Sequence, residues 1–174
     1  MLIRGKAWVF GRNVNTDLIF PKIWFRPTYE PGEMASHLMV GIDEAIFGTC
    51  TGGRIDDFRV AASIMKGRRL APHTRMMVNP GSRETYLQAM HEGLIDIMVE
   101  AGATIGVPGC GPCSGCHQGM LAPAENAITN ASRNFKGRFG SPEANAYVAS
   151  SATVAASAIA GCIVSPAQAS SSNY

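Results

Sequence analysis

The sequence is poor in charge, in aromatic residues and in uninterrupted apolar runs. Charged residues make up 16% and aromatic residues 7% of the 174 residues, and the formal net charge is only +2. The basic residues are scattered, so no patch is expected that would attract nucleic acid or an acidic membrane surface. Met1 to Phe10 lack the apolar core and the small-residue cleavage site of a secretory signal. These absences favour a cytoplasmic protein that acts on small molecules.

What the sequence does contain is typical of one close-packed globular domain. Hydrophobic residues make up 46% of the chain, and there are 19 glycines. The segment from Ala144 to Tyr174 has no charged residue, but Ser, Thr, Asn and Ala dilute its apolar character. We therefore expect a buried helix there and not a membrane span.

Helix-like and strand-like stretches alternate beyond Cys50, which is typical of a parallel sheet covered by helices. We predict a three-layer α/β/α domain with a mainly parallel sheet over residues 44–168. A short strand-containing segment at 1–43 precedes it, and a frayed tail at 169–174 follows it.

Individual elements follow from periodicity, turn residues and caps. The predicted strands are 6–10, 45–47, 74–78, 104–107, 126–129 and 146–149. The predicted helices are 33–39, 55–66, a helix from Ser82 to His91, a short helix ending at Glu100, and a last helix from Ser151 to Gly161. Ser82 and Ser151 are expected to cap their helices, because a serine hydroxyl can accept a hydrogen bond from an unpaired backbone N–H of the first turn.

Cysteine is present, but not as a disulfide framework. Three of the five cysteines lie within seven residues, which favours metal binding in a reducing compartment. Cys110 and Cys113 are separated by two residues in a glycine-rich loop, so both thiolates can face one cluster. Cys50 follows a predicted strand, and a parallel sheet gathers such loops at one edge. From spacing alone, Cys50 is as well explained as a buried small side chain as it is as a third ligand.

Four motifs carry a resemblance to a known family. They are Gly-Thr-Cys-Thr-Gly-Gly-Arg-Ile-Asp-Asp at 48–57, Asn-Pro-Gly-Ser-Arg-Glu at 79–84, Pro-Gly-Cys-Gly-Pro-Cys-Ser-Gly at 108–115 and Arg-Asn-Phe-Lys-Gly-Arg at 133–138. With these motifs in the same order, residues from about 45 to 164 resemble the last domain of the large subunit of isopropylmalate dehydratase, a relative of aconitase. The first 43 residues resemble the start of the small subunit of the same enzymes.

The resemblance implies a function and a set of site residues. Cys50, Cys110 and Cys113 would hold a 4Fe-4S cluster, and Arg133 and Arg138 would bind the carboxylates of the substrate. Three thiolates leave one iron without a protein ligand, and such an iron can act as a Lewis acid on a departing hydroxyl. The implied reaction is the dehydration and rehydration of a 2-hydroxy di- or tricarboxylic acid.

Other uses of the same cysteines remain open. Cys110, Cys113 and Cys116 have ferredoxin-like spacing, and with Cys50 they could close an electron-transferring 4Fe-4S cluster. The stretch from Cys113 to His117 also fits the haem-attachment pattern, which normally belongs to exported proteins. Zinc is a further possibility, although a glycine-rich loop suits a bulky cluster better.

Two departures from the family pattern bear on activity. Ser132 stands where the family usually has Asn before the first arginine. The loop that carries the small subunit's catalytic serine has no counterpart, and Ser82 belongs to a large-subunit motif, where it is a helix cap. Dehydration still requires a base for the carbon-bound proton. We therefore expect a partner subunit to supply the missing groups, and slow or no turnover by this chain alone.

Overall fold

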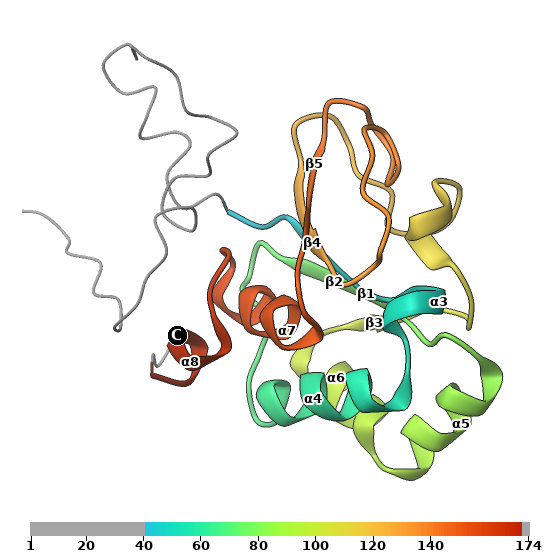
Figure 1. Cartoon of the computed structure of the whole chain (residues 1–174). Helices are drawn as coiled ribbons and strands as arrows, with labels where there is room; N and C mark the ends of the chain where they lie inside the picture. Colours follow the sequence, from blue (N-terminus) through green and yellow to red (C-terminus); the bar gives the residue numbers. More distant parts are fainter. Residues whose placement is uncertain (1–40, 172–174) are drawn as a thin grey trace, which may run out of the picture. The chain divides into compact units, whose positions relative to one another are not determined.

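The computed structural model describes residues 41–171 (Figure 1). The chain divides into two units, Met1–Met39 and Val40–Tyr174, and the described residues all belong to the second. The predictions of a strand at 6–10 and of a helix at 33–39 lie outside the described residues.

The centre of the fold is a five-stranded sheet in the order β3-β2-β1-β4-β5. Its strands are β1 (Glu44–Gly48), β2 (Arg75–Asn79), β3 (Thr104–Ile105), β4 (Asn126–Thr129) and β5 (Asn145–Val148). Every pairing between neighbouring strands is parallel, and β1 at the centre pairs with β2 from Glu44 opposite Arg75 to Gly48 opposite Asn79. The prediction of an α/β fold with a mainly parallel sheet is confirmed.

The helices are short, and most of them lie between consecutive strands. They are α3 (Thr49–Gly52), α4 (Ile55–Met65), α5 (Arg83–His91), α6 (Leu94–Ala101), the 3-10 turn η2 (Gly111–Ser114), α7 (Ser151–Ala160) and α8 (Pro166–Ser171). The predicted cap of α5 is confirmed, because Ser82 Oγ accepts a hydrogen bond of 3.2 Å from Thr85 N.

The strand order determines which connections cover which face. From β1 to β3 the chain moves outward in one direction, and β4 and β5 then lie on the other side of β1. Right-handed crossovers therefore place the β1–β2–β3 connections on one face and the β3–β4–β5 connections on the other. Helices α4 to α7 pack on the first face, with Phe47 and Phe58 in edge-to-face contact at 5.4 Å (Figure 1).

The second face of the sheet has a different cover. Ile46 packs there with Cys113, Leu121 and Phe139, which come from η2 and the long loops around β4 and β5. The fold is thus three-layered, as predicted. Among the described residues, loops and η2 form the third layer, in agreement with the absence of predicted helices between 104–107 and 146–149.

Two local predictions near the carboxyl end of the chain are wrong. Ser150, not Ser151, caps α7: its Oγ accepts a hydrogen bond of 3.2 Å from Thr153 N. Ser151 Oγ instead donates to Asp57 at 2.6 Å and ties α7 to the start of α4. The tail predicted to fray from residue 169 is helical as far as Ser171, and Ala169 is buried. The sequence pattern could not show which of the adjacent Ser150 and Ser151 caps α7, because both have the same capping ability.

The uncharged segment after residue 144 forms β5, α7 and α8. Six successive residues of α7, from Val154 to Ile159, are buried, so this helix is a core element as expected. None of the helices in residues 41–171 has the length and apolar character needed to cross a membrane.

Candidate functional site

The three predicted cysteine ligands lie at the carboxyl edge of the sheet. Cys50 is in α3, directly after β1, whereas Cys110 and Cys113 lie in the connection from β3 to β4. These two connections leave on opposite faces of the sheet, so the crevice between them is a topological switch point, where open α/β sheets bind ligands. Cys50 and Cys110 are exposed, and Cys113 is buried.

Contacts between the thiols show that this edge brings the cysteines together. The pKa of Cys110 is raised, first by the charge of Cys50, next by a hydrogen bond with Cys50, and then by burial and by Cys113. Arg138 opposes this shift of the pKa. Cys50 and Cys110, 60 positions apart in the sequence, thus lie close enough for their charges to interact, and α3 packs against η2.

The turn that carries Cys50 has an unusual backbone. Gly48 has φ +99° and Thr49 has φ +67°, so two successive residues are left-handed. A Cβ atom on Gly48 would lie 2.0 Å from the carbonyl oxygen of Asn79, so only glycine fits. A left-handed threonine is strained, and strain of this kind is typical of functional turns.

Asn130, just past the end of β4, holds this turn in place. Its Oδ1 accepts a hydrogen bond of 2.8 Å from Gly48 N, and its Nδ2 donates to Gly52 O at 2.9 Å and to Ser151 Oγ at 3.0 Å. Both ends of α3 are thus fixed by one carboxamide. Sequence reasoning missed Asn130; the available signal was a polar residue directly after a buried strand, which at a sheet edge often serves a site.

Asn79 supports the loop of Cys110 and Cys113, as Asn130 supports α3. It is fully buried, and its Nδ2 donates to Val107 O at 3.1 Å. A Cβ atom on Gly106 or Gly111 would lie 2.4 Å from the Asn79 side chain. The glycines of this loop therefore allow the backbone to close over Asn79, and sequence reasoning assigned that residue no role.

Of the two arginines predicted to face the substrate, the structure brings one to the cysteines. Arg138 Nη2 lies 3.9 Å from Cys113 Sγ, and the guanidinium stacks over the Phe135 ring at 5.3 Å from its centre. Arg138 Nε is buried without a hydrogen-bond partner among the described residues. Arg133 is exposed, and within residues 41–171 no ion pair holds it.

Cys116 and Ser132 are the remaining residues that the sequence analysis singled out. Cys116 is exposed and its Sγ lies 3.4 Å from Ser114 Oγ; it is not among the groups that shift the pKa of Cys110. Ser132, at the departure from the family pattern, donates its backbone N–H to Thr51 Oγ1 at 3.3 Å and so joins its loop to α3.

The donor set at this edge suits a cluster better than a single ion. In the described part of the chain, no group of three or more His, Cys, Asp or Glu side chains is arranged to hold one metal ion. A cluster is wider than an ion, so its thiolates lie farther apart.

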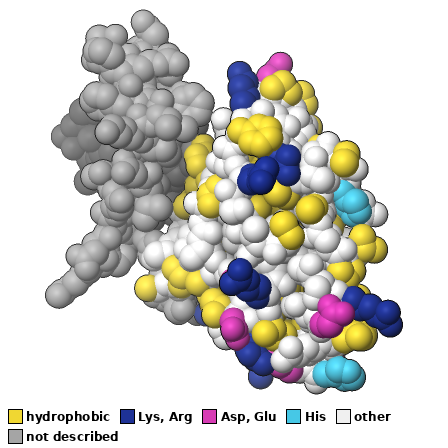
Figure 2. Space-filling model, turned by 45° about the vertical axis from the view of Figure 1, so that its right-hand side comes forward, with side chains coloured by type: hydrophobic (Ala, Val, Ile, Leu, Met, Phe, Trp, Pro, Cys, Tyr) yellow, Lys and Arg dark blue, Asp and Glu magenta, His cyan; other side chains and the backbone are white. Residues whose placement is uncertain are grey.

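The face in Figure 2 carries its Lys and Arg side chains spread out and not in one patch, as the scattered basic residues predicted.

Comparison with known proteins agrees with this geometry. Residues 25–161 match the aconitase family (aconitate hydratase). The chain belongs to this family. The 3-isopropylmalate dehydratase large subunit of Hydrogenobaculum sp. is 51% identical over 132 residues, which are 76% of this chain and 31% of that protein. The homoaconitase large subunit of Thermus thermophilus is 48% identical over 125 residues, 72% of this chain and 30% of that protein.

A third relative gives the same extent of match. The 3-isopropylmalate dehydratase large subunit 1 of Pyrococcus furiosus is 46% identical over 136 residues, 78% of this chain and 32% of that protein. The chain therefore spans about a third of the length of the curated relatives it matches. The family match begins at residue 25 and so extends into the 1–43 segment, which resembles the start of a small subunit.

Proposed function

We propose that this chain is the iron-sulfur domain of a hydro-lyase of the 3-isopropylmalate dehydratase type, with a 4Fe-4S cluster held by Cys50, Cys110 and Cys113. One observation carries the proposal: α3, which holds Cys50, packs against η2, which holds Cys113, and the charge of Cys50 raises the pKa of Cys110 beside them. Thiolate is the ligand that iron-sulfur clusters use most.

The surroundings of the thiols fit such a group. Arg138 places positive charge 3.9 Å from Cys113 Sγ, which complements the negative charge of cysteine ligands around a cluster. The left-handed turn at Gly48 and the glycines over Asn79 let backbone, and not side chains, border the site. Free thiols of this kind persist in a reducing compartment, which favours the cytoplasm.

The bound cluster would supply a Lewis-acidic iron that polarises the hydroxyl of a 2-hydroxy di- or tricarboxylic acid. The chain's own residues would orient that acid. Arg138, stacked on Phe135 beside the cysteines, is positioned to bind a carboxylate by donating two parallel N–H hydrogen bonds to it. Arg133, exposed on the same loop, would bind a second carboxylate.

The base for the carbon-bound proton is proposed to come from another polypeptide or from a segment beyond these residues. Ser82, the superficial candidate, already uses its hydroxyl to cap α5. The relatives named above are large subunits, and this chain spans about a third of their length. We therefore propose a small-subunit partner and little turnover by this chain alone.

Reconstitution under anaerobic conditions tests both parts of the proposal. The chain is incubated with ferrous iron and sulfide, and bound iron, bound sulfide and isopropylmalate turnover are measured. The proposal predicts about four irons per chain and negligible turnover. Co-purification with a small subunit, followed by turnover of the pair, would support the partner. Turnover by the chain alone would show that its base is already present.

The closed-cluster alternative is tested in the same preparation with Cys116→Ala. If Cys50, Cys110 and Cys113 are the whole ligand set, this variant binds as much iron as the parent chain. If Cys116 is a fourth ligand, iron binding falls, and the chain is better described as an electron-transfer module.

A further inference from the structure

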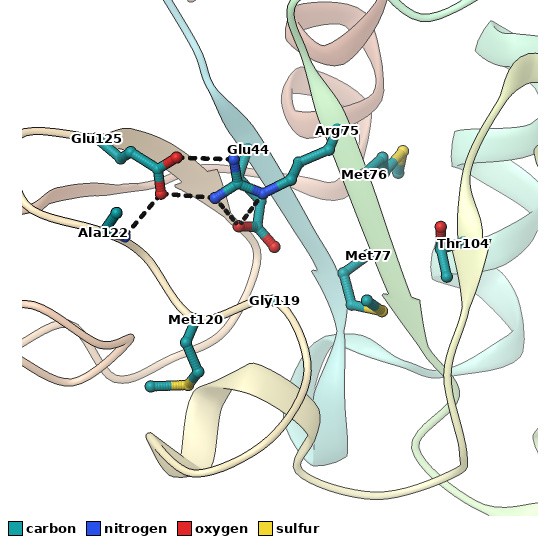
Figure 3. Close-up of a pocket in the computed structure, with 9 residues that line it drawn as sticks. All are labelled: Glu44, Arg75, Met76, Met77, Thr104, Gly119, Met120, Ala122 and Glu125. Atoms are coloured by element: carbon teal, nitrogen blue, oxygen red, sulfur yellow. Dashed lines mark hydrogen bonds and ion pairs between the residues drawn. The ribbon is translucent and has the colours of Figure 1, made fainter.

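A cavity of about 420 Å³ lies beside the amino ends of β1 and β2, where Gly119 and Met120 from the last part of the β3–β4 connection border it (Figure 3). Glu44 and Arg75 are the first residues of β1 and β2 and pair directly across the sheet. Together with Glu125, just before β4, they form the charged side of the cavity, while Met77 and Met120 contribute apolar surface. Its volume falls in the range of small-molecule pockets.

Glu44 has an unusual environment for a carboxylate. The residue is fully buried, and its Oε2 accepts a hydrogen bond from Arg75 Nε at 2.8 Å and forms an ion pair with Nη2 at 2.7 Å. The other oxygen, Oε1, has no hydrogen-bond partner among the described residues. Figure 3 shows Oε1 on the side of the carboxylate away from the guanidinium, toward Gly119 and Met77. A buried carboxylate oxygen without a donor is costly, so this atom is suited to a ligand.

Gly119 lies directly beside that buried oxygen. A Cβ atom at this position would lie 2.5 Å from Glu44 Oε1, and the residue is left-handed with φ +75°. A larger side chain would therefore fill the space beside the carboxylate.

The charge at the cavity favours a cation. Arg75 donates to both carboxylates: its Nη1 and Nη2 lie 2.8 and 2.6 Å from the two oxygens of Glu125, in addition to its bonds to Glu44. When Glu44 is ionised, two carboxylates against one guanidinium leave one negative charge, and Arg75 has little capacity left for an anion. Burial raises the pKa of Glu44 to about 7, against the opposing effect of Arg75. A further positive charge beside the carboxylate would therefore stabilise its ionised form.

The number of free acceptors narrows the class of cation. A metal ion needs several ligands, and no group of three or more His, Cys, Asp or Glu side chains in the described chain could hold one. A planar guanidinium binds best to two oxygens, but only one is free on Glu44. An ammonium group acts as a compact point charge and needs only one carboxylate oxygen. The flexible thioethers of Met77 and Met120 can pack along an alkyl stem.

We propose that this cavity binds a primary alkylammonium group, with its nitrogen at Glu44 Oε1 and its alkyl stem along Met77 and Met120. None of the cysteines takes part, so the inference is independent of the proposed function. It can be tested on the full chain without iron.

The test is a titration with n-butylammonium chloride, followed by NMR shifts at constant ionic strength. Saturable binding is expected. Tetramethylammonium, with the same charge but no N–H donor, should bind at least about tenfold more weakly, because a hydrogen bond to a charged group contributes about 1.5–3 kcal/mol. Glu44→Gln should weaken n-butylammonium binding to a similar degree. Glu100→Gln, an exposed carboxylate change of the same charge, should leave it unchanged.

A second variant protects the test against misfolding of Glu44→Gln. Thr104→Trp places a large side chain at the exposed rim, where Thr104 lines the cavity without contacting the ion pairs. It should abolish binding while circular dichroism stays that of the parent. Absence of saturable binding, equal binding of both cations, or unchanged binding by Glu44→Gln would each overturn the proposal. Nα-acetyl-lysine methylamide separates two sources: if it binds as well, a protein lysine fits the cavity; if only n-butylammonium binds, the ligand is a free amine.

Discussion

The two edges of the same sheet are built by different means. At the carboxyl edge, backbone conformation shapes the site: left-handed Gly48 and Thr49, and glycines closed over Asn79, position cysteine thiols. At the amino edge, side-chain charge shapes the site: Arg75 joins the buried Glu44 to Glu125. The first edge presents cysteine thiols, and the second presents a carboxylate oxygen that has no donor within residues 41–171. If the comparison holds, substitutions at one edge should leave the other intact.

The largest expected effect is on iron binding at the carboxyl edge. Cys50→Ser, Cys110→Ser or Cys113→Ser should each lower the iron retained after reconstitution by more than about tenfold, since even changes around the ligands of a metal site cost 10–100-fold in affinity. Iron and sulfide analysis after gel filtration measures this. Cys162→Ser is the matched control, because Cys162 also has a free thiol but lies away from the site, where its backbone forms a β-bridge with Gly41. Full iron content in Cys50→Ser would remove that residue from the ligand set.

Gly48→Ala tests whether backbone shape governs the carboxyl edge. The added methyl would clash with the Asn79 carbonyl at 2.0 Å in a left-handed conformation, so the free energy of unfolding should fall by at least about 3 kcal/mol. Gly67→Ala is the control: Gly67 is also left-handed at φ +72°, but nothing lies within 4 Å of its Cβ position. It should cost only about 1 kcal/mol. Urea unfolding of both variants gives the difference, and equal losses would contradict the steric argument.

Asn130→Ala removes the carboxamide that holds both ends of α3. It leaves Gly48 N, Gly52 O and Ser151 Oγ to find other partners, at an expected cost of about 2–3 kcal/mol. The variant should also retain less iron than the parent. Asn145→Ala removes a single hydrogen bond, to Asn126, and should cost about 1 kcal/mol with no loss of iron. Full iron retention by Asn130→Ala would show that Cys50 does not depend on this residue.

Glu44, at the amino edge, should make the free energy of unfolding depend on pH. Because the pKa of Glu44 in the folded protein is raised to about 7, the folded state holds a proton that the unfolded state has released. The stabilisation from this proton is complete below the unfolded pKa and is lost as pH rises through about 7. Between pH 5 and pH 8, the free energy of unfolding of Glu44→Gln should therefore rise relative to the parent, by up to about 3 kcal/mol.

Glu125→Gln is the control for this measurement. Its hydrogen bonds with Arg75 lower the pKa of Glu125, so its contribution changes only under more acidic conditions, below its ordinary pKa. Urea unfolding at several pH values from 5 to 8 should show a large changing difference for Glu44→Gln and a smaller one for Glu125→Gln, which acts only by removing one of the charges that raise the pKa of Glu44. The same slope in both variants would mean that Glu44 does not titrate in this range.

The sequence was informative where residue type and local spacing carry the chemistry. The Ser82 cap, the buried α7 and the parallel sheet were all predictable, because each depends on a short pattern. Strand alternation also indicated which sheet edge would carry the Cys50 and Cys110 loops.

Residues that act through tertiary contacts were not predictable from pattern. Asn130 reaches Gly48 across 82 positions, and Arg75 reaches Glu125 across 50. Nothing local marks such pairs, because the register of the parallel strands creates them. The packing of the loops on the second face against Ile46 was not predictable for the same reason, because Cys113, Leu121 and Phe139 meet there only in the folded chain.

The central claim is that Cys50, Cys110 and Cys113 hold a 4Fe-4S cluster with one open iron. EPR spectroscopy of the reconstituted chain, before and after brief oxidation, tests it most directly. The account predicts that the oxidised sample loses its unligated iron and gives a 3Fe-4S signal, with the same result for Cys116→Ala. A cluster that survives oxidation intact, and that Cys116→Ala destroys, would contradict it.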